Sequence, residues 1–280
     1  DGYTALMCAA ENGRERVVEL LLQRGAELGR QRSSGGAALM AAAGQGHERV
    51  VELLLQRGAE INLQKSDGFT ALMLAAIDGH ERVVELLLQR GAEINKQDSD
   101  GYTALMCAAE NGRELVVELL LQHGAELSLQ RSNGGTALMA AAANGHPAFV
   151  LRLLRAGADA TLRTAAGHTA LCFAKAKGHA KCVRALEKHL TAEVAAEKEA
   201  EREEERAAER AAAEAAGARD AEGGPAGGEA GKRGKGEGGE EQKRGGGGGG
   251  AGPSQDPEAA SEAAAAKPAK LDREGLIRLL

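Results

Sequence analysis

The sequence predicts an all-α solenoid of stacked helix pairs with β-turn or hairpin loops, followed by a charged helix and a disordered tail. First, a phrase of the form Gly-x-x-Ala-Leu returns every 33 residues without insertion or deletion, in units that begin near residues 1, 34, 67, 100, 133 and 166. Fixed periods of this size are typical of solenoids, in which each unit packs only on its neighbours. Second, aromatic residues make up only 2% of the chain and Trp is absent. A single globular core needs more large side chains than this. A thin helical stack does not, because its contacts need mainly Leu, Val and Ala. Third, the composition changes after residue 190 to Ala, Glu, Arg and Gly.

These patterns divide the chain into a repeat array and a tail. The array covers residues 1–190, with units near 1–33, 34–66, 67–99, 100–132, 133–165 and 166–190. The tail consists of a charged Ala/Glu/Arg helix over 191–217, a Gly-rich disordered linker over 218–270 and a short apolar segment over 271–280. Because the sequence opens inside a repeat phrase and stops in mid-pattern, we expect a fragment at both ends. The apolar segment is then either a docking helix or the first turn of a further domain.

The cleanest copy of the unit runs from Asp67 to Ser99. Thr70 is placed to cap the start of a short helix, which Gly79-His80 then ends. A second helix is expected near Glu81–Arg90, with an apolar face wide enough to pack on both adjacent units. Gly91 is placed for a left-handed C-terminal cap, and a polar turn follows it. One unit is therefore predicted to contain two short antiparallel helices and an extended loop.

The segment GFTALMLAAIDGHERVVELLLQRGAEIN, which starts at Gly68, resembles an ankyrin repeat. Its T-x-L-x-x-A-A core, Gly-His break, V-V-x-L-L-L run and Gly-Ala-(Glu/Asp) ending recur with the 33-residue period over residues 1 to about 190. The resemblance implies stacked helical hairpins that bind a protein along their concave side, through the loop tips and the exposed edge of the first helix. It also implies that Asn62 and Asn95, which follow Gly-Ala-Glu-Ile, are either turn-stabilising residues or sites of hydroxylation.

This chain departs from the family pattern Thr-Pro-Leu-His, because it has Thr-Ala-Leu-Met in that place. We expect methionine side chains to fill the space of that histidine by packing. The five residues concerned are Met7, Met40, Met73, Met106 and Met139. In the sixth unit, exposed lysines are expected to form the polar outer face of a terminal cap.

Part of the array is duplicated, since residues 1–15 are identical to residues 100–114. The duplicated block is three units long. At about 10 Å per packed helix layer, we expect two similar surface patches roughly 30 Å apart.

Residues with catalytic or metal-binding chemistry do not converge. Four histidines occupy the same place in their units, just after the glycine between the two helices: His47, His80, His146 and His179. With one residue per layer they cannot share a metal ion, so we interpret them as structural turn residues. The sequence contains no phosphate loop, nucleophile elbow or Cys/His pair in a catalytic context. We therefore predict no catalytic residue, no metal site and no cofactor.

Charge and hydropathy narrow the classes of partner. Residues 1–190 contain 21 Lys or Arg and 21 Asp or Glu, so the formal net charge of -6 belongs to the tail. A neutral array lacks the basic footprint of a nucleic-acid-binding surface. The apolar stretches are far shorter than the roughly 20 residues that cross a bilayer. We expect a monomer that binds a protein, with no nucleic acid or membrane as partner. The cysteines are interpreted as small buried thiols, which favours a cytoplasmic or nuclear location.

The charged tail helix carries Arg202, Arg206 and Arg210 at a spacing of four residues, flanked by glutamates. Such pairs stabilise a solvated helix. A single helix that acts as a spacer is the expected structure, and a coiled coil with an alanine seam is the alternative.

Positions that differ between the internal copies are candidates for partner binding, because packing does not dictate them. The third residue of the unit, the end of the first helix and the turn residue two before the next unit all vary. Rigid aromatic side chains at loop tips provide contact area at low entropic cost. We predict a central patch of Phe69, Ile77, Asp98 and Tyr102, unless the aromatic rings only cover neighbouring loops. The full set of predicted partner-binding residues is Tyr3, Phe69, Ile77, Asp98, Tyr102 and Arg131.

The function that these observations favour is a noncatalytic protein–protein interaction module or scaffold. The alternative is a substrate-recognition or targeting region of a larger enzyme, such as a kinase, ligase or transferase, with its catalytic domain outside this sequence.

Overall fold

The computed structural model describes residues 2–221. The Gly-rich sequence beyond Ala221 and the apolar segment 271–280 lie outside the described residues. Within the described part, twelve helices and no strands are present, which confirms the predicted all-α class. The first helices of the six units are α1 Ala5–Glu11, α3 Ala38–Gly44, α5 Ala71–Asp78, α7 Ala104–Glu110, α9 Ala137–Ala143 and α11 Ala170–Ala176. The second helices are α2 Glu15–Gln23, α4 Glu48–Gln56, α6 Glu81–Gln89, α8 Glu114–Gln122, α10 Pro147–Arg155 and α12 Ala180–Ala221.

The first helix of most units begins at a threonine, as predicted for Thr70. The Thr70 hydroxyl oxygen accepts a hydrogen bond from the Met73 backbone N–H at 3.3 Å. Units 1, 4, 5 and 6 repeat this cap through Thr4, Thr103, Thr136 and Thr169. In unit 2, Ala37 stands in this place and provides no side-chain cap. A lost cap of this kind costs about 1 kcal/mol in helix stability.

Glycine ends both helices of the unit at the predicted places. Gly79 follows α5 with φ of 80°, and Gly91 follows α6 with φ of 87°. This left-handed conformation is nearly free of strain only for glycine, so the chain turns sharply at these positions.

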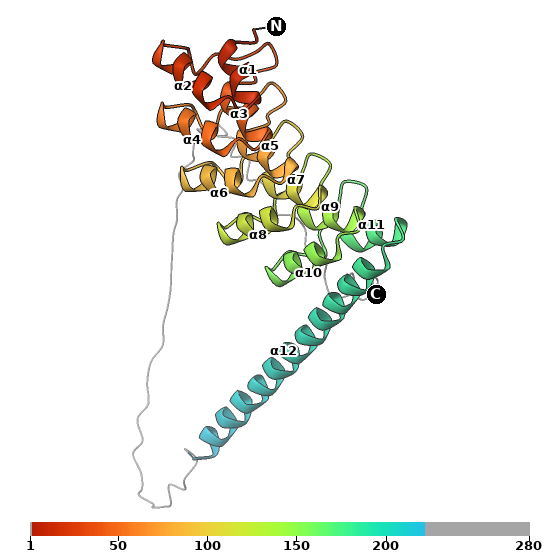
Figure 1. Cartoon of the computed structure of the whole chain (residues 1–280). Coiled ribbons are helices and arrows are strands. Elements are labelled where there is room, and N and C mark those ends of the chain that lie inside the picture. Colours follow the sequence, from red (N-terminus) through yellow and green to blue (C-terminus); the bar gives the residue numbers. More distant parts are fainter. Residues whose placement is uncertain (1, 222–280) are drawn as a thin grey trace, which may run out of the picture. The chain divides into compact units, whose positions relative to one another are not determined.

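The helices form two layers, with first helices beside first helices and second helices beside second helices (Figure 1). The core lies between the layers and between the units. The five methionines are buried, with exposed fractions between 1% and 4%, which confirms that they pack in the place of the family's histidine. Valines of the second helices, such as Val51, Val84 and Val117, are fully buried at the layer contact. Burial of this apolar surface is the main source of the array's stability.

The loops between units are hairpins stitched to one another through their backbones. In the hairpin before α7, the Asp98 N–H donates to the Tyr102 carbonyl at 2.9 Å. Between hairpins, the Ser99 N–H donates to the Asp67 carbonyl at 3.0 Å. The approach is close, because a Cβ added to Gly68 would lie 2.5 Å from the Ser99 nitrogen. The loop tips are therefore held in a regular row.

Helix α12 starts as the second helix of unit 6 and crosses the predicted boundary at residues 190 and 191 without a break. The physical reason is that no glycine or proline occurs between residues 179 and 216. Its first part buries Cys182, Leu186, Leu190 and Val194, which follow one another at four-residue intervals. From residue 195 to residue 211 every side chain is exposed. The lysines expected on the outer face of unit 6 are also exposed, namely Lys175, Lys177, Lys181 and Lys188.

Candidate protein-binding surface

The hairpin tips and the exposed edges of the first helices form one continuous face of the array, which we call the loop-side surface. Three positions of each unit recur on it: the third, the eleventh and the thirty-second. All six sequence-predicted binding residues stand at one of these positions, so the unit structure places them on the same face.

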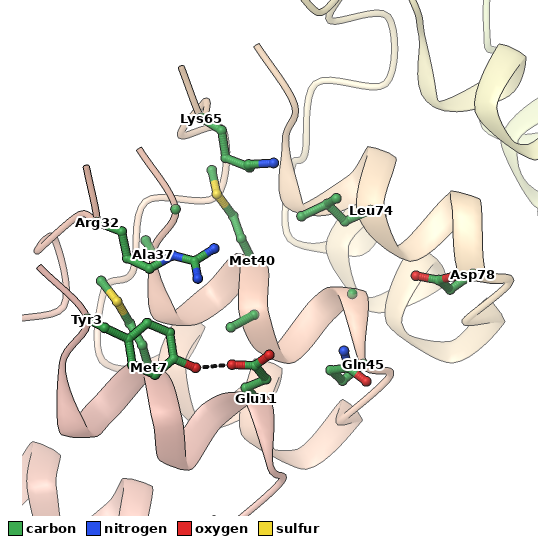
Figure 2. A pocket seen from close by; sticks show the side chains of 13 residues that line it. Tyr3, Met7, Glu11, Arg32, Ala37, Met40, Gln45, Lys65, Leu74 and Asp78 are labelled. Atoms are coloured by element: carbon green, nitrogen blue, oxygen red, sulfur yellow. Dashed lines mark hydrogen bonds between the residues drawn. The ribbon is translucent and has the colours of Figure 1, made fainter. Parts of the chain in front are cut away.

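In unit 1 these positions bring together Tyr3, Glu11 and Arg32. The Tyr3 hydroxyl donates a hydrogen bond to the Glu11 carboxylate (Figure 2). The Arg32 guanidinium lies over the Tyr3 ring, 5.3 Å from its centroid. Although the Tyr3 hydroxyl contacts Glu11 and its ring contacts Arg32, Tyr3 remains 42% exposed. Its ring is therefore available for contact with a partner.

Unit 4 repeats this arrangement with Tyr102, Glu110 and Arg131. The Arg131 guanidinium lies 4.3 Å from the Tyr102 ring centroid and also donates to the Tyr102 hydroxyl oxygen. Burial and the nearby Glu110 carboxylate raise the pKa of Tyr102, and the Arg131 guanidinium partly opposes them. Cation–aromatic contacts of this kind contribute about 0.5–1 kcal/mol at exposed sites, so they restrain the ring more than they stabilise the fold.

Unit 3 is more apolar at the same positions. The Lys65 ammonium lies 5.6 Å from the Phe69 ring centroid and forms an ion pair with Asp67 at 2.9 Å. Ile77 stands where Glu11 and its counterpart in unit 4 stand, and it is half-buried. The middle of the loop-side surface is therefore apolar, with charged groups on both sides of it.

Asp98 differs from the other predicted binding residues, because its side chain is buried. One carboxylate oxygen accepts hydrogen bonds from the Tyr102 N–H at 2.7 Å and from the Asp100 N–H at 2.9 Å. This is the side-chain-to-backbone pattern that stabilises a turn. Asp98 thus holds the loop from which Tyr102 projects, a role that was not predicted from the sequence.

Two hollows open on the loop-side surface. The first has a volume of about 230 Å³ and is lined by residues of units 1 to 3, including Tyr3, Glu11, Arg32, Gly36 and Met40 (Figure 2). The second has a volume of about 110 Å³ and is lined by residues of units 4 to 6. Each hollow lies at a unit that has glycine instead of an aromatic residue in the third position. From the sequence, the third position was seen to vary between units, but no hollow was predicted.

The repeated histidines bridge neighbouring units, which confirms their structural role. The His80 Nε2 atom lies 2.9 Å from the Gly44 carbonyl oxygen, and His47 and His179 make the equivalent contact. In unit 4 an arginine replaces the histidine, and the Arg113 Nε donates to the Ile77 carbonyl at 2.8 Å. His146 instead contacts the Phe149 ring, with centroids 5.2 Å apart.

Asn62 and Asn95 likewise join units. The Asn62 side-chain oxygen accepts a hydrogen bond from the Glu93 N–H at 2.9 Å, and Asn95 does the same with the Glu126 N–H at 2.9 Å. These bonds stabilise the contact between neighbouring units, whereas the predicted role was within the asparagine's own turn.

The four cysteines are free thiols. Cys107 and Cys182 are buried as predicted. The prediction of buried thiols was wrong for Cys8, which is exposed although it stands at the position equivalent to Cys107, and for Cys172, which is half-buried. Burial, with a further contribution from Asp98 and Glu110, raises the pKa of the Cys107 thiol to about 12. No group of three or more potential metal ligands is found among the described residues.

Helix pairs repeated in strict register, with hairpin loops stitched across units, define the protein as a helical solenoid that presents an extended surface. The family model for ankyrin repeats (3 copies) matches residues 1–65, 39–131, 117–198 and 138–216. The chain therefore belongs to the ankyrin-repeat family. Ankyrin repeats are general protein–protein interaction modules, and such domains are typically noncatalytic. A comparison with curated proteins gives no match. Within residues 2–221, no helix has the length and apolar character needed to span a bilayer.

Proposed function

We propose that the array is a noncatalytic docking module that binds a segment of another protein along the loop-side surface. The observation that carries this proposal is the row of aromatic rings at the hairpin tips of units 1, 3 and 4, each with a cationic side chain over it. Rings that are already restrained lose little entropy on binding, so they are efficient contact residues. The proposed cellular location is the cytoplasm or nucleus.

The contact residues in this proposal are Tyr3, Phe69, Ile77, Tyr102 and Arg131. Asp98 contributes by holding the turn that carries Tyr102. Aromatic residues and arginine are enriched at the centre of protein interfaces, where other charged residues are depleted.

The test is selection from a displayed library of random 12-residue peptides on the immobilised full-length chain. We expect the wild-type chain to enrich a family of related peptides. The Phe69→Ala/Tyr102→Ala double variant should bind these peptides at least about tenfold more weakly, which corresponds to a loss of about 1.4 kcal/mol or more in binding free energy. Leu115→Ala is the matched control, because Leu115 is 52% exposed but lies on the second helix α8. Circular dichroism checks that all three proteins keep the same helical content. Equal peptide binding by the double variant would exclude this surface as the docking site.

A further inference from the structure

The two hollows are copies of one another. Adding 99, the length of three units, to the residue numbers of the first hollow gives most of the residues that line the second. The pairs include Glu11 and Glu110, Arg32 and Arg131, Gly36 and Gly135, Met40 and Met139, Gln45 and Asn144, and Leu74 and Phe173. The duplication seen in the sequence therefore extends to a shaped feature of the surface.

Each hollow exists because a side chain is missing from its hairpin tip. Units 1, 3 and 4 have Tyr3, Phe69 and Tyr102 at the third position, where units 2 and 5 have Gly36 and Gly135. The backbone does not require glycine at these two places, since neither has a positive φ. An added Cβ at Gly36 would meet only the flexible end of the Arg32 side chain, at 3.2 Å. An added Cβ at Gly135 would meet Asn133 Oδ1 at 3.0 Å and Arg131 Nε at 3.2 Å, which are again side-chain atoms. Both glycines thus leave space that the backbone conformation does not require.

The charges around the first hollow are arranged with cations at the loop end and acceptors at the helix end (Figure 2). Arg32 at the loop end lies over the Tyr3 ring, and Lys65 is paired with Asp67. The helix end carries the carboxylates of Glu11 and Asp78, both exposed, and no cation. In the second hollow the helix end has Glu110 and Asn144, and the lining cation, Arg131, again lies at the loop end. Lys177, the equivalent of Asp78, is not among the residues that line this hollow.

The floor between these ends is made by methionines, Met7 and Met40 in the first hollow and Met139 in the second. Methionine is unbranched and polarisable, so it adapts to an aliphatic chain laid against it. A lysine or arginine side chain has an apolar stem, which matches the methionine floor, and a cationic head, which matches the acidic end of the hollow.

We propose that the two hollows are equivalent subsites for basic side chains, so that the array binds a protein segment with two Lys- or Arg-containing motifs, one per hollow. This proposal rests on the function proposed above and specifies the partner. At about 10 Å per layer the hollows are roughly 30 Å apart, which an extended chain spans with about nine residues. A partner with two motifs gains affinity, because once the first motif is bound the second binds within the same complex.

The test uses the most enriched library peptide, synthesised as a single copy and as two copies joined by a 12-residue Gly/Ser linker. Isothermal titration calorimetry with the full-length chain is expected to give two single-copy peptides per chain. The tandem peptide should bind as one per chain and about tenfold or more tightly. Replacement of the peptide's basic residue by Gln should weaken single-copy binding at least about tenfold, the usual effect of losing a charge-assisted hydrogen bond.

Two variants assign the sites. The variants Gly36→Tyr and Gly135→Tyr each introduce a tyrosine at the hairpin tip. The fold tolerates tyrosine there, because units 1 and 4 have Tyr3 and Tyr102 at the same position. Each variant should bind one single-copy peptide instead of two and should lose the advantage of the tandem peptide. Gly36→Ala, which leaves most of the hollow open, should keep both sites and is the matched control.

The outcomes separate the two proposals. A library that enriches no peptide would overturn both. One peptide per chain, unchanged binding by both tyrosine variants, or indifference to the peptide's basic residue would overturn the paired-hollow proposal alone, because the docking surface would still be in place.

Discussion

The Gln97 side-chain amide donates a hydrogen bond to the main-chain carbonyl of Gln130, one full unit further along the array, at 3.0 Å. The same amide group donates to the Gly101 carbonyl of its own hairpin at 2.8 Å. Gln64 makes the corresponding pair of bonds to Gly68 and Gln97. A row of glutamines therefore ties each hairpin to the next, in addition to the backbone bonds between loops.

Gln97→Ala should destabilise the array by about 1–2 kcal/mol, because it removes two hydrogen bonds of about 0.5–1.5 kcal/mol each and leaves two carbonyls without that partner. Urea unfolding followed by circular dichroism measures the change. Gln89→Ala is the control, since the Gln89 amide is exposed and bonds only within its own helix, to Glu85. Equal unfolding midpoints for the two variants would mean that the glutamine row adds nothing to stability.

His80→Ala should weaken the contact between units 2 and 3 by about 1–2 kcal/mol, and His80→Arg should restore most of this loss. A carbonyl oxygen only accepts, so the His80 Nε2 atom must carry the proton in its contact with Gly44. Arg113 provides the same donor in unit 4, which is why arginine is the expected substitute. Thermal unfolding of both variants tests this, and an arginine variant as unstable as the alanine variant would contradict it.

Gly68→Ala should destabilise the protein by at least about 1 kcal/mol, since alanine is strained at positive φ and its Cβ would collide with the next loop. The φ of Gly68 is 86°, and a Cβ added to it would lie 2.5 Å from the Ser99 nitrogen. Gly36→Ala, in the neighbouring hairpin, lacks both problems and should leave stability within about 0.5 kcal/mol of the wild type. Chemical denaturation of the two variants measures their free energies of unfolding. A loss of stability in Gly36→Ala larger than about 0.5 kcal/mol would show that its hairpin needs glycine.

Cys8 should react with iodoacetamide at pH 8 and Cys107 should not, although the two thiols lie in identical 15-residue sequences. The thiolate is the reactive form, and a pKa raised to about 12 leaves on the order of one Cys107 in 10⁴ ionised at pH 8. Reactivity of Cys107 should therefore rise only as the pH approaches 12 or as the array unfolds. Mass spectrometry of tryptic peptides distinguishes the two sites, because the Cys107 peptide begins at Gln97. Rapid labelling of folded Cys107 would mean that this thiol is accessible, and labelling in urea is the control.

The fold was predictable because the units repeat. Thr70, Gly79 and Gly91 marked the helix ends in the sequence, and each performs the expected role in the structure. The boundary near residue 190 was less predictable, since it was placed where the composition changes. Composition alone does not end a helix, and α12 continues through this point.

The candidate site was predictable in part. Variation between copies pointed to the loop-side surface, where residues that packing does not dictate lie, and its binding of a partner stays a prediction. It could not distinguish a residue that contacts a partner from one that shapes a turn, and Asp98 is of the second kind. Nor could it reveal the hollows, since a missing side chain becomes a hollow only when its neighbours are in place. The glutamine row was hidden for a related reason, because recurrent polar residues in loops are usually solvated.

The column of buried methionines makes the first five units of the array sensitive to the same chemical damage. Conversion of a thioether to a sulfoxide introduces a polar oxygen at a buried position, and reductase enzymes are needed to reverse it. Met7, Met40 and Met139 line the open hollows, so peroxide should reach them before Met73 and Met106. Oxidative stress would then change the floors of the hollows first and the stacking of the helices afterwards.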